Sequence, residues 1–219
     1  VYECFLESFT KKYEDINFQL HYSLNDVRIF DWWNYGIKNK KKFLIKPRYS
    51  AIIDNIDKKK HEKIMSDYRY VRRYEIKNFK KYESKIERCE FNIESLLNLY
   101  LENLTDEENN ENIKFSLSKL VDATEKNFGD IVCYKEASSN KIIYFSLILK
   151  DNNSTHLALN CAEKKWKKEG IMAWALNNLI ASYKNKYSKF DFNGANSPLR
   201  GDDKHSYGAS EKLFFQLKY

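Results

Sequence analysis

The first residues whose spacing suggests chemistry form a basic row. Arg69, Arg73 and Lys77 recur every four residues, so a helix would place them on one face, with Arg72 and Lys80 beside them. Guanidinium groups bind phosphate oxygens bidentately, which makes Arg69 and Arg73 candidate substrate-binding residues. The same side chains also suit ion pairs with neighbouring glutamates, and the sequence leaves both interpretations open.

The row lies in a locally basic segment. Between Gly36 and Glu90 there are 18 Lys and Arg against 8 Asp and Glu, a net charge of +10 in a chain whose total is +7. Such a segment favours an anionic partner, such as a phosphate, a nucleotide, RNA or an acidic lipid. For the run 38–42 alone, a solvated lysine-rich surface is the better interpretation.

Histidines and cysteines do not follow the spacing of a metal site. The histidines are His21, His61, His156 and His205, and the cysteines are Cys4, Cys89, Cys133 and Cys161. They contain no CxxC pair and no His pair at metal-ligand spacing. We therefore expect no metal, reduced thiols and a cytoplasmic location.

Other common functional patterns are also missing from the sequence. There is no GxSxG, GxxxxGK[ST] or GxGxxG, so hydrolase, P-loop and Rossmann interpretations have no motif to support them. No stretch approaches 18 consecutive apolar residues, so we expect no membrane span. The 219 residues, 42% of them apolar, suffice for one large domain or for one domain with a partial second.

Hydrophobic patterning gives the elements that must position these residues. In the first part of the chain we expect a helix at 1–13, a strand at 16–22, an aromatic turn region at 26–36, an extended segment at 43–53 interrupted by Pro47, and a basic helix capped by Asp57. From residue 80 we expect a strand at 82–88, a helix capped by Asn92, an acidic linker at 105–112, a helix at 113–128 ended by Gly129, strands at 131–135, 142–149 and 156–161, a helix at 170–183, a strand at 190–192, a short helix at 198–206 and a strand at 213–217. This order predicts an α/β fold on a mixed sheet, and the helix at 170–183 implies a parallel crossover.

The same order resembles the GNAT acyltransferase fold. In the last third, Lys189–Pro198 and Lys204–Ala209 resemble the FemAB-like branch of peptidoglycan-bridge acetyltransferases, in which a "DFEGS" or "DFxGan" strand leads through a proline to "FKxSFGA". Upstream, Arg48–Ser50 and Arg69–Arg73 resemble the "RYT" and "RRxxIRKA" stretches of that branch. The resemblance implies a GNAT-like mixed sheet, with 1–57 as a reduced N-terminal copy and 58–219 as the acyltransferase domain.

The resemblance also implies a donor site. Neighbouring strands at 156–161 and 190–192 would diverge, and an acyl-CoA donor would pair with backbone that includes Leu159 and Cys161. The family's Q/RxxGxG/A loop has its counterpart at 167–172. There the amides of Gly170, Ile171 and Met172 at a helix start, with Lys167 and Lys168, would bind the pyrophosphate. An ordinary strand-to-helix turn explains Gly170 equally well, and Met172 departs from the family's small residue.

The acyl-transfer candidates lie at the carboxyl end of the 190–192 strand. Asn193 stands where the family has a glutamate, and with Asn196 and Ser206 it forms the candidate catalytic set. Asn196 is more simply a turn residue before the proline. Asp191 points to the opposite sheet face from its neighbours and is a candidate substrate-binding residue, or a partner for a lysine. His205 is the one histidine near this set, and we favour packing for Tyr207.

The function implied by the resemblance is N-acyl transfer. The donor would be acetyl-CoA or another acyl-CoA, and the acceptor an amine on a small or nucleotide-linked molecule, such as an amino sugar of cell-envelope polysaccharide synthesis. Two alternatives stay open. One is an aminoacyl-tRNA-dependent enzyme, with tRNA as the partner, and the other is a non-catalytic binding module that kept the fold.

Overall fold

The structure, a computed structural model, describes residues 2–104 and 111–219. Its described strands form one mixed sheet in the order β1-β8-β2-β7-β6-β5-β4-β3. The strands are β1 Asn17–Gln19, β2 Leu44–Asp54, β3 Ile86–Cys89, β4 Gly129–Glu136, β5 Ile142–Lys150, β6 Ser154–Ala162, β7 Lys189–Gly194 and β8 Ser210–Lys218. Neighbouring strands are antiparallel except β6 and β7, which are parallel, so the predicted α/β fold class and parallel crossover are both confirmed.

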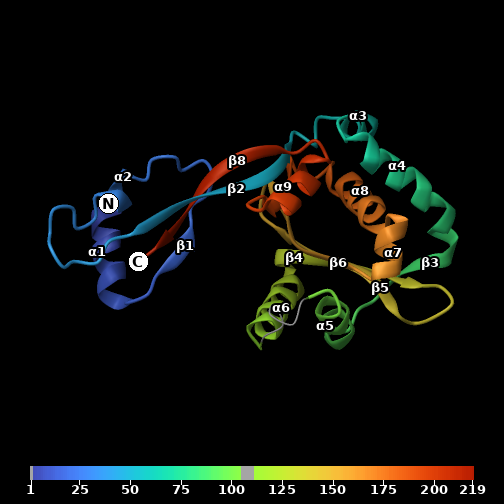
Figure 1. Ribbon diagram of the computed structural model, residues 1–219, viewed down its shortest axis with the longest axis horizontal. Helices are drawn as coiled ribbons and strands as arrows, with labels where there is room; N and C mark the ends of the chain where they lie inside the picture. Colours follow the sequence, from blue (N-terminus) through green and yellow to red (C-terminus); the bar gives the residue numbers. More distant parts are fainter. Residues whose placement is uncertain (1, 105–110) are drawn as a thin grey trace.

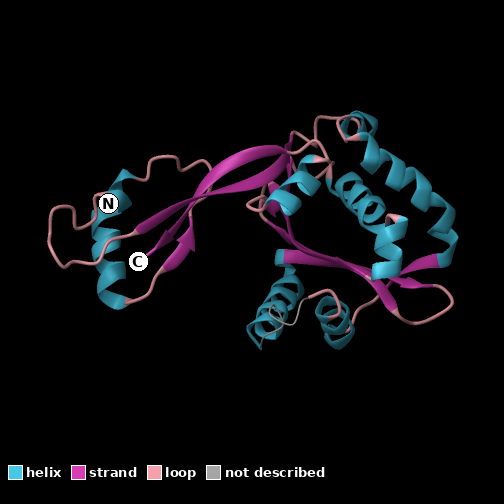
Figure 2. Ribbon diagram, viewed as in Figure 1, coloured by secondary structure: helices cyan, strands magenta, loops and turns pink. Residues whose placement is uncertain are grey.

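Helices cover both faces of the central strands (Figures 1 and 2). On one face lie α3 His61–Ser66, α4 Tyr70–Phe79, α7 Lys164–Glu169 and α8 Ile171–Tyr183, and on the other lie α5 Ile93–Leu101 and α6 Glu111–Ala123. Because it has helices above and below, β5 is buried without interruption from Ile142 to Ile148. This explains why its sequence is a continuous apolar run rather than an alternating one.

A second, smaller lobe lies at the N-terminus, at the left of Figure 1. There α1 Tyr2–Lys12 and α2 Arg28–Asp31 surround a separate apolar cluster of Leu6, Phe30, Phe43 and Leu217. β2 and β8 pair over Leu44–Ile52 and Ser210–Lys218 and run from this lobe into the main one. The domain boundary after residue 57 stays a prediction, and β2 on its N-terminal side pairs with strands from its C-terminal side.

The basic segment forms two helices instead of the predicted one. The N-cap of α3 is Lys60 rather than Asp57, and α3 ends before Asp67. Arg69 then adopts an extended conformation as the N-cap of α4, and its N–H donates to the Ser206 carbonyl oxygen at 2.8 Å. A contact with a distant segment therefore breaks the helical pattern, and Arg69 does not share a helix face with Arg73.

Three other local predictions are wrong for identifiable reasons. The strand expected from Tyr82 begins at Ile86, because 80–85 forms a 3-10 helix in which the Tyr82 ring packs on Phe79 and Trp166. Gly129 does not end a helix in the left-handed region but opens β4 with extended backbone. Pro47 lies inside β2, opposite Phe215, without interrupting it. The acidic linker predicted at 105–112 falls largely outside the described residues.

Candidate active site

The central feature of the site is a fork between β6 and β7. The two strands pair over three residues each, Ser154–His156 with Lys189–Asp191, although β6 continues to Ala162. Just beyond the last pair, Ala158 is an extra residue in β6 relative to β5. A bulge of this kind bends a strand and turns its backbone groups out of register. The predicted divergence of these strands is therefore present, and it begins after His156 and Asp191.

Asn193 spans the base of this fork. Its side-chain Nδ2 donates to the Leu157 carbonyl oxygen at 2.8 Å, and its backbone N–H donates to Asp191 Oδ1 at 2.7 Å. Its φ of 57° is in the left-handed region, which asparagine tolerates better than most residues. The side chain thus replaces a ladder hydrogen bond between the strands and holds them apart at a fixed distance.

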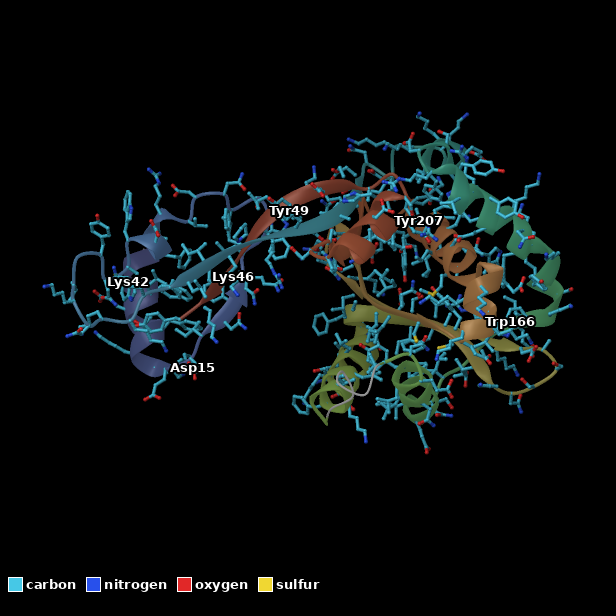
Figure 3. The ribbon with its side chains drawn as sticks, viewed as in Figure 1. Asp15, Lys42, Lys46, Tyr49, Trp166 and Tyr207 are labelled. Carbon is cyan, nitrogen blue, oxygen red and sulfur yellow. The ribbon has the colours of Figure 1, made fainter. Side chains whose placement is uncertain are left out.

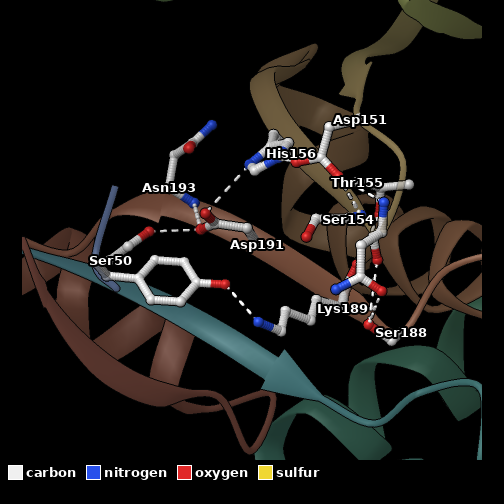
Figure 4. A network of polar contacts seen from close by, with 11 residues as sticks. Ser50, Asp151, Ser154, Thr155, His156, Ser188, Lys189, Asp191 and Asn193 are labelled. Carbon is white, nitrogen blue, oxygen red and sulfur yellow. Dashed lines mark hydrogen bonds and ion pairs between the residues drawn. The ribbon is translucent and has the colours of Figure 1, made fainter. Parts of the chain in front are cut away.

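A polar network surrounds Asp191 at the same level (Figure 4). Asp191 is 6% exposed, and its Oδ1 also accepts the Ser50 hydroxyl at 2.5 Å. Its Oδ2 lies 3.2 Å from His156 Nδ1, while His156 Nε2 lies 2.9 Å from Asp151 Oδ2. A buried carboxylate requires such partners, because an unpaired buried charge is very costly.

The network favours the charged imidazolium. The hydrogen bond to the Asp191 carboxylate raises the pKa of His156; burial opposes this effect, and the contact with Asp151 adds to it. Burial also opposes the ionisation of Asp151, but bonds from His156 and from the N–H groups of Asn153 and Ser154 lower its pKa overall. The His156 side chain is 27% exposed, so solvent or a substrate can reach it.

A loop of the N-terminal lobe contacts this region. Lys189 Nζ donates to the Tyr22 hydroxyl at 2.6 Å, and this bond raises the pKa of Lys189. Tyr22 lies between β1 and α2, so the contact joins the smaller lobe to the first residue of β7. Lys189 and Asp191 are two residues apart on β7, which places the loop near the polar network.

The other two predicted catalytic residues contact different elements. Asn196 accepts the Tyr49 N–H at 2.7 Å and donates to the Tyr49 carbonyl oxygen at 3.1 Å, which ties it to β2. Ser206 is buried, accepts Arg72 Nε at 2.6 Å and donates to the Asp203 carbonyl oxygen. Within the described residues, no contact brings Asn193, Asn196 and Ser206 together, and their catalytic role stays a prediction.

Gly170 has a clear packing reason in addition to its predicted donor role. It has a φ of 97° between α7 and α8, and a Cβ there would lie 3.1 Å from the Glu75 carbonyl oxygen on α4. α7 separates β6 from α8, where we expected a direct strand-to-helix turn. Lys167 and Lys168 are exposed in the last turn of α7, Ile171 is fully buried and Met172 is partly buried. Donor binding by these residues stays a prediction.

The two predicted donor residues on β6 differ in exposure. Leu159 is partly buried, whereas Cys161 is buried with its thiol directed at the Leu99 carbonyl oxygen. Burial raises the pKa of Cys161 to about 12, so the group is a thiol at neutral pH and is not a nucleophile. The backbone of both residues lies beyond the β6–β7 pairing, on the open arm of the fork.

The arginines predicted to bind substrate have partners within the chain. Arg69 forms an ion pair with Asp202 at 2.5 Å, and Arg73 donates to the Tyr68 carbonyl oxygen at 2.5 Å. Arg72 pairs with Glu75 and Asp203 and lies over the Tyr207 ring. Substrate binding by Arg69 and Arg73 stays a prediction.

Tyr207 packs in the main lobe as expected. It is 1% exposed and contacts the rings of Tyr68 and Phe192. Trp166 of α7 is also buried, at a separate place in the same lobe, against Phe79 and Tyr82 (Figure 3). His205, the histidine expected near the site, contacts Glu211 and the Ala209 carbonyl oxygen at the start of β8.

Sequence reasoning missed His156, Asp151 and Ser50. They come from three separate segments, and their contact with Asp191 depends on the β6–β7 register and on β2 lying beside β7. For Ser50 and His156 the available signal was a polar residue beside apolar ones in a strand, whereas Asp151 lies in the turn between β5 and β6. Among the described residues, no group of three or more His, Cys, Asp or Glu is arranged to hold a metal ion, and no helix is long and apolar enough to cross a membrane.

Comparison with known proteins finds similar structures but no similar sequences. No protein-family model matches the sequence, and no curated protein matches it. FemX is similar with a TM-score of 0.65 and 9% identity, over 97% of this chain and 75% of FemX. L-PGS from Bacillus licheniformis is similar with a TM-score of 0.59 and 13% identity, over 98% of this chain and 70% of L-PGS.

A third similar structure is a GCN5-related glucosamine N-acetyltransferase region in a fungal multi-domain β-N-acetylglucosaminidase. Its TM-score is 0.51 at 13% identity, over 89% of this chain and 23% of that one. At 9–13% sequence identity, the similarity to these structures shows a shared fold. The chain has a GNAT-like fold, which it shares with FemX and L-PGS, as its element order predicted.

Proposed function

We propose that this chain is an N-acyltransferase whose acyl donor lies in the fork between β6 and β7. The observation that carries the proposal is the three-residue pairing of these strands, followed by the Ala158 bulge. Beyond Leu157, the edge of β6 that faces β7 offers backbone N–H and C=O groups to a ligand, because β7 does not pair with them. An extended donor arm that carries amide groups fits such an edge.

The reaction is attack by an amine on an activated acyl carbonyl. The amine nitrogen forms a C–N bond, the C–S or C–O bond to the donor breaks, and one proton leaves the amine. A positioned base speeds this proton transfer, and backbone N–H groups stabilise the oxyanion. We assign His156 Nε2 as the base that accepts the amine proton. Asp191 is hydrogen-bonded to the other ring nitrogen, Nδ1, and its carboxylate is oriented by the Ser50 hydroxyl. Nε2 contacts the Asp151 carboxylate, whose side chain is 54% exposed, and the proposed step requires the amine to take the place of that carboxylate.

Acyl-CoA is the donor that we favour, with an amine acceptor such as an amino sugar of cell-envelope polysaccharide synthesis in the cytoplasm. Lys167 and Lys168 supply two exposed positive charges just before α8. The second candidate donor is aminoacyl-tRNA, which the net charge of +10 between Gly36 and Glu90 favours. A non-catalytic module would bind a donor without transferring its acyl group.

Calorimetry separates the donors. We expect acetyl-CoA to bind with 1:1 stoichiometry, and the double variant Lys167→Glu/Lys168→Glu to weaken binding at least tenfold by reversing two charges. Lys164→Glu, on the exposed first turn of the same helix, is the matched control and should change affinity little. An absence of heat with CoA, together with salt-dependent retention of tRNA, would overturn the CoA version.

The variant His156→Gln tests the catalytic assignment. We expect kcat to fall by about 10²- to 10⁴-fold with little change in donor affinity, because a positioned base contributes about that much. In the unmodified chain, kcat should rise with pH through the pKa of His156, because the neutral imidazole accepts the proton. His205→Gln is the control. Equal losses in the two variants, or an unchanged pH profile in His156→Gln, would contradict the assignment.

A further inference from the structure

A groove of about 510 Å³ lies on the outward face of α4, away from the fork. Its lining residues are Tyr70, Arg73, Tyr74, Lys77, Asn78 and Lys81. The opposite face of α4 buries Ile76 and Phe79, and Glu75 meets Gly170 of α8. The groove is therefore a separate surface from the fork, and the proton transfer assigned to His156 does not use it.

Two tyrosines on this surface are exposed, and their rings lie next to each other at a small angle. Tyr70 is 74% exposed and Tyr74 is 56% exposed, although burying an aromatic ring is normally favourable. Their ring centroids are 6.3 Å apart with an angle of 25° between the planes. The two neighbouring rings therefore offer exposed faces on which bases can stack.

The cations beside the rings have no acidic partner among the described ion pairs. Arg73 donates to the carbonyl oxygens of Ser66 and Tyr68, and Lys81 donates to Asn78 Oδ1 at 3.0 Å. These partners are neutral, so the charges remain uncompensated. Arg73 and Lys77 are four residues apart on α4, about 6 Å along the helix, and Lys81 follows in the first turn of the 3-10 helix at 80–85. The groove therefore combines a line of positive charge with an aromatic platform.

We propose that this groove binds single-stranded nucleic acid, with bases stacked on Tyr70 and Tyr74 and phosphates against Arg73, Lys77 and Lys81. Stacking on a side-chain ring requires an unpaired base, and every base has a face to offer, so binding is tolerant of sequence. An acidic peptide would use the cations but not the parallel rings. The proposal goes beyond the acyl-transfer reaction and does not depend on it.

Fluorescence polarisation with the full chain and a labelled twelve-nucleotide RNA or DNA strand tests the proposal. We expect binding that weakens with salt, with a slope of log K against log salt of about −2 for three phosphate contacts. Tyr70→Ala/Tyr74→Ala should weaken binding at least tenfold. Lys77→Ala/Lys81→Ala should make the slope shallower by about 1.4. Arg73 is left unchanged because it binds carbonyl groups at the α3–α4 turn.

The matched control is Tyr35→Ala/Lys42→Ala. It removes an exposed tyrosine and its neighbouring lysine from the N-terminal lobe, and it should leave binding unchanged. All the substituted side chains are exposed, so thermal unfolding should show intact folding in every variant. Failure of single strands to bind at 50 mM salt would overturn the proposal. So would equal binding of duplex, polyglutamate or anionic vesicles with no effect of the tyrosine substitutions.

Discussion

Asp191 is the residue on which the polar network of the fork depends. Its carboxylate accepts bonds from the Ser50 hydroxyl and the Asn193 N–H on one oxygen and contacts His156 on the other. Three segments thereby converge on one buried charge. Because the cost of burying a charge is offset only by complete hydrogen bonding, each partner contributes to stability as well as to orientation.

His156 makes the stability of the fold depend on pH in a defined direction. Its pKa is raised in the folded chain, mainly by Asp191, so the stabilisation is fully present below its unfolded value of about 6.5. It is lost as pH rises through the folded pKa. Urea unfolding from pH 5.5 to 8.5 should therefore show stability falling with pH relative to His156→Gln.

The quantity to compare is the difference in unfolding free energy between the unmodified chain and His156→Gln at each pH, because other groups titrate in both. Burial lowers the pKa of His61, which gives stability the opposite slope in the unmodified chain and in the variant alike. Parallel profiles of the two proteins across this range would show that the contact with Asp191 does not hold the proton.

The Ser50 hydroxyl should carry a measurable share of stability. Ser50→Ala leaves Oδ1 of a buried carboxylate with one donor fewer, and hydrogen bonds to charged groups contribute about 1.5–3 kcal/mol. We expect a loss of that size in the free energy of unfolding measured by denaturant titration. Ser66→Ala removes an exposed hydroxyl bonded to the Lys63 carbonyl oxygen and should cost less than about 0.5 kcal/mol. Similar losses in both variants would contradict a special role for Ser50.

At the scale of elements, the sequence pattern predicted those helices and strands that depend on burial and capping by nearby residues. β5 was predictable because its apolar run is buried on both faces, and α5 because the Asn92 side chain caps it through the Ser95 N–H. The break before α4 was not predictable, because it depends on a bond from Arg69 to a segment more than 130 residues away. The fork followed from the family-like order of elements, but the pairing of His156 with Asp191 required the register.

The contact between α4 and α8 should make Gly170 more sensitive to substitution than a typical turn glycine. Gly170→Ala places a Cβ 3.1 Å from the Glu75 carbonyl oxygen and also meets the left-handed φ cost of about 1–2 kcal/mol. Gly36→Ala has a φ of 74° with nothing within 4 Å, so it incurs the φ cost alone. Thermal unfolding should show a larger loss for Gly170→Ala. Equal losses of stability in the two variants would mean that α4 can shift away from the added Cβ at little cost.

At the scale of the whole molecule, two lobes share one sheet through the long pair β2 and β8 (Figure 1). The N-terminal lobe has its own apolar cluster, separate from the clusters under α5 and α8. A two-stranded connection of this kind bends more readily than a wide sheet covered by helices. The contact between Tyr22 and Lys189 is therefore placed to hold the smaller lobe near the fork.

Removing that contact should loosen the lobe without unfolding it. Tyr22→Phe keeps the ring over Lys189 but deletes the hydroxyl that accepts its ammonium at 2.6 Å. We expect faster amide hydrogen exchange in residues 20–27, unchanged exchange in β5, and a global stability loss within about 1 kcal/mol, because the bond is partly exposed. Tyr13→Phe, on the exposed end of the same lobe, is the control. Unchanged exchange in 20–27 would show that β2 and β8 alone fix the lobe, because the loop would then keep its position without the tyrosine hydroxyl.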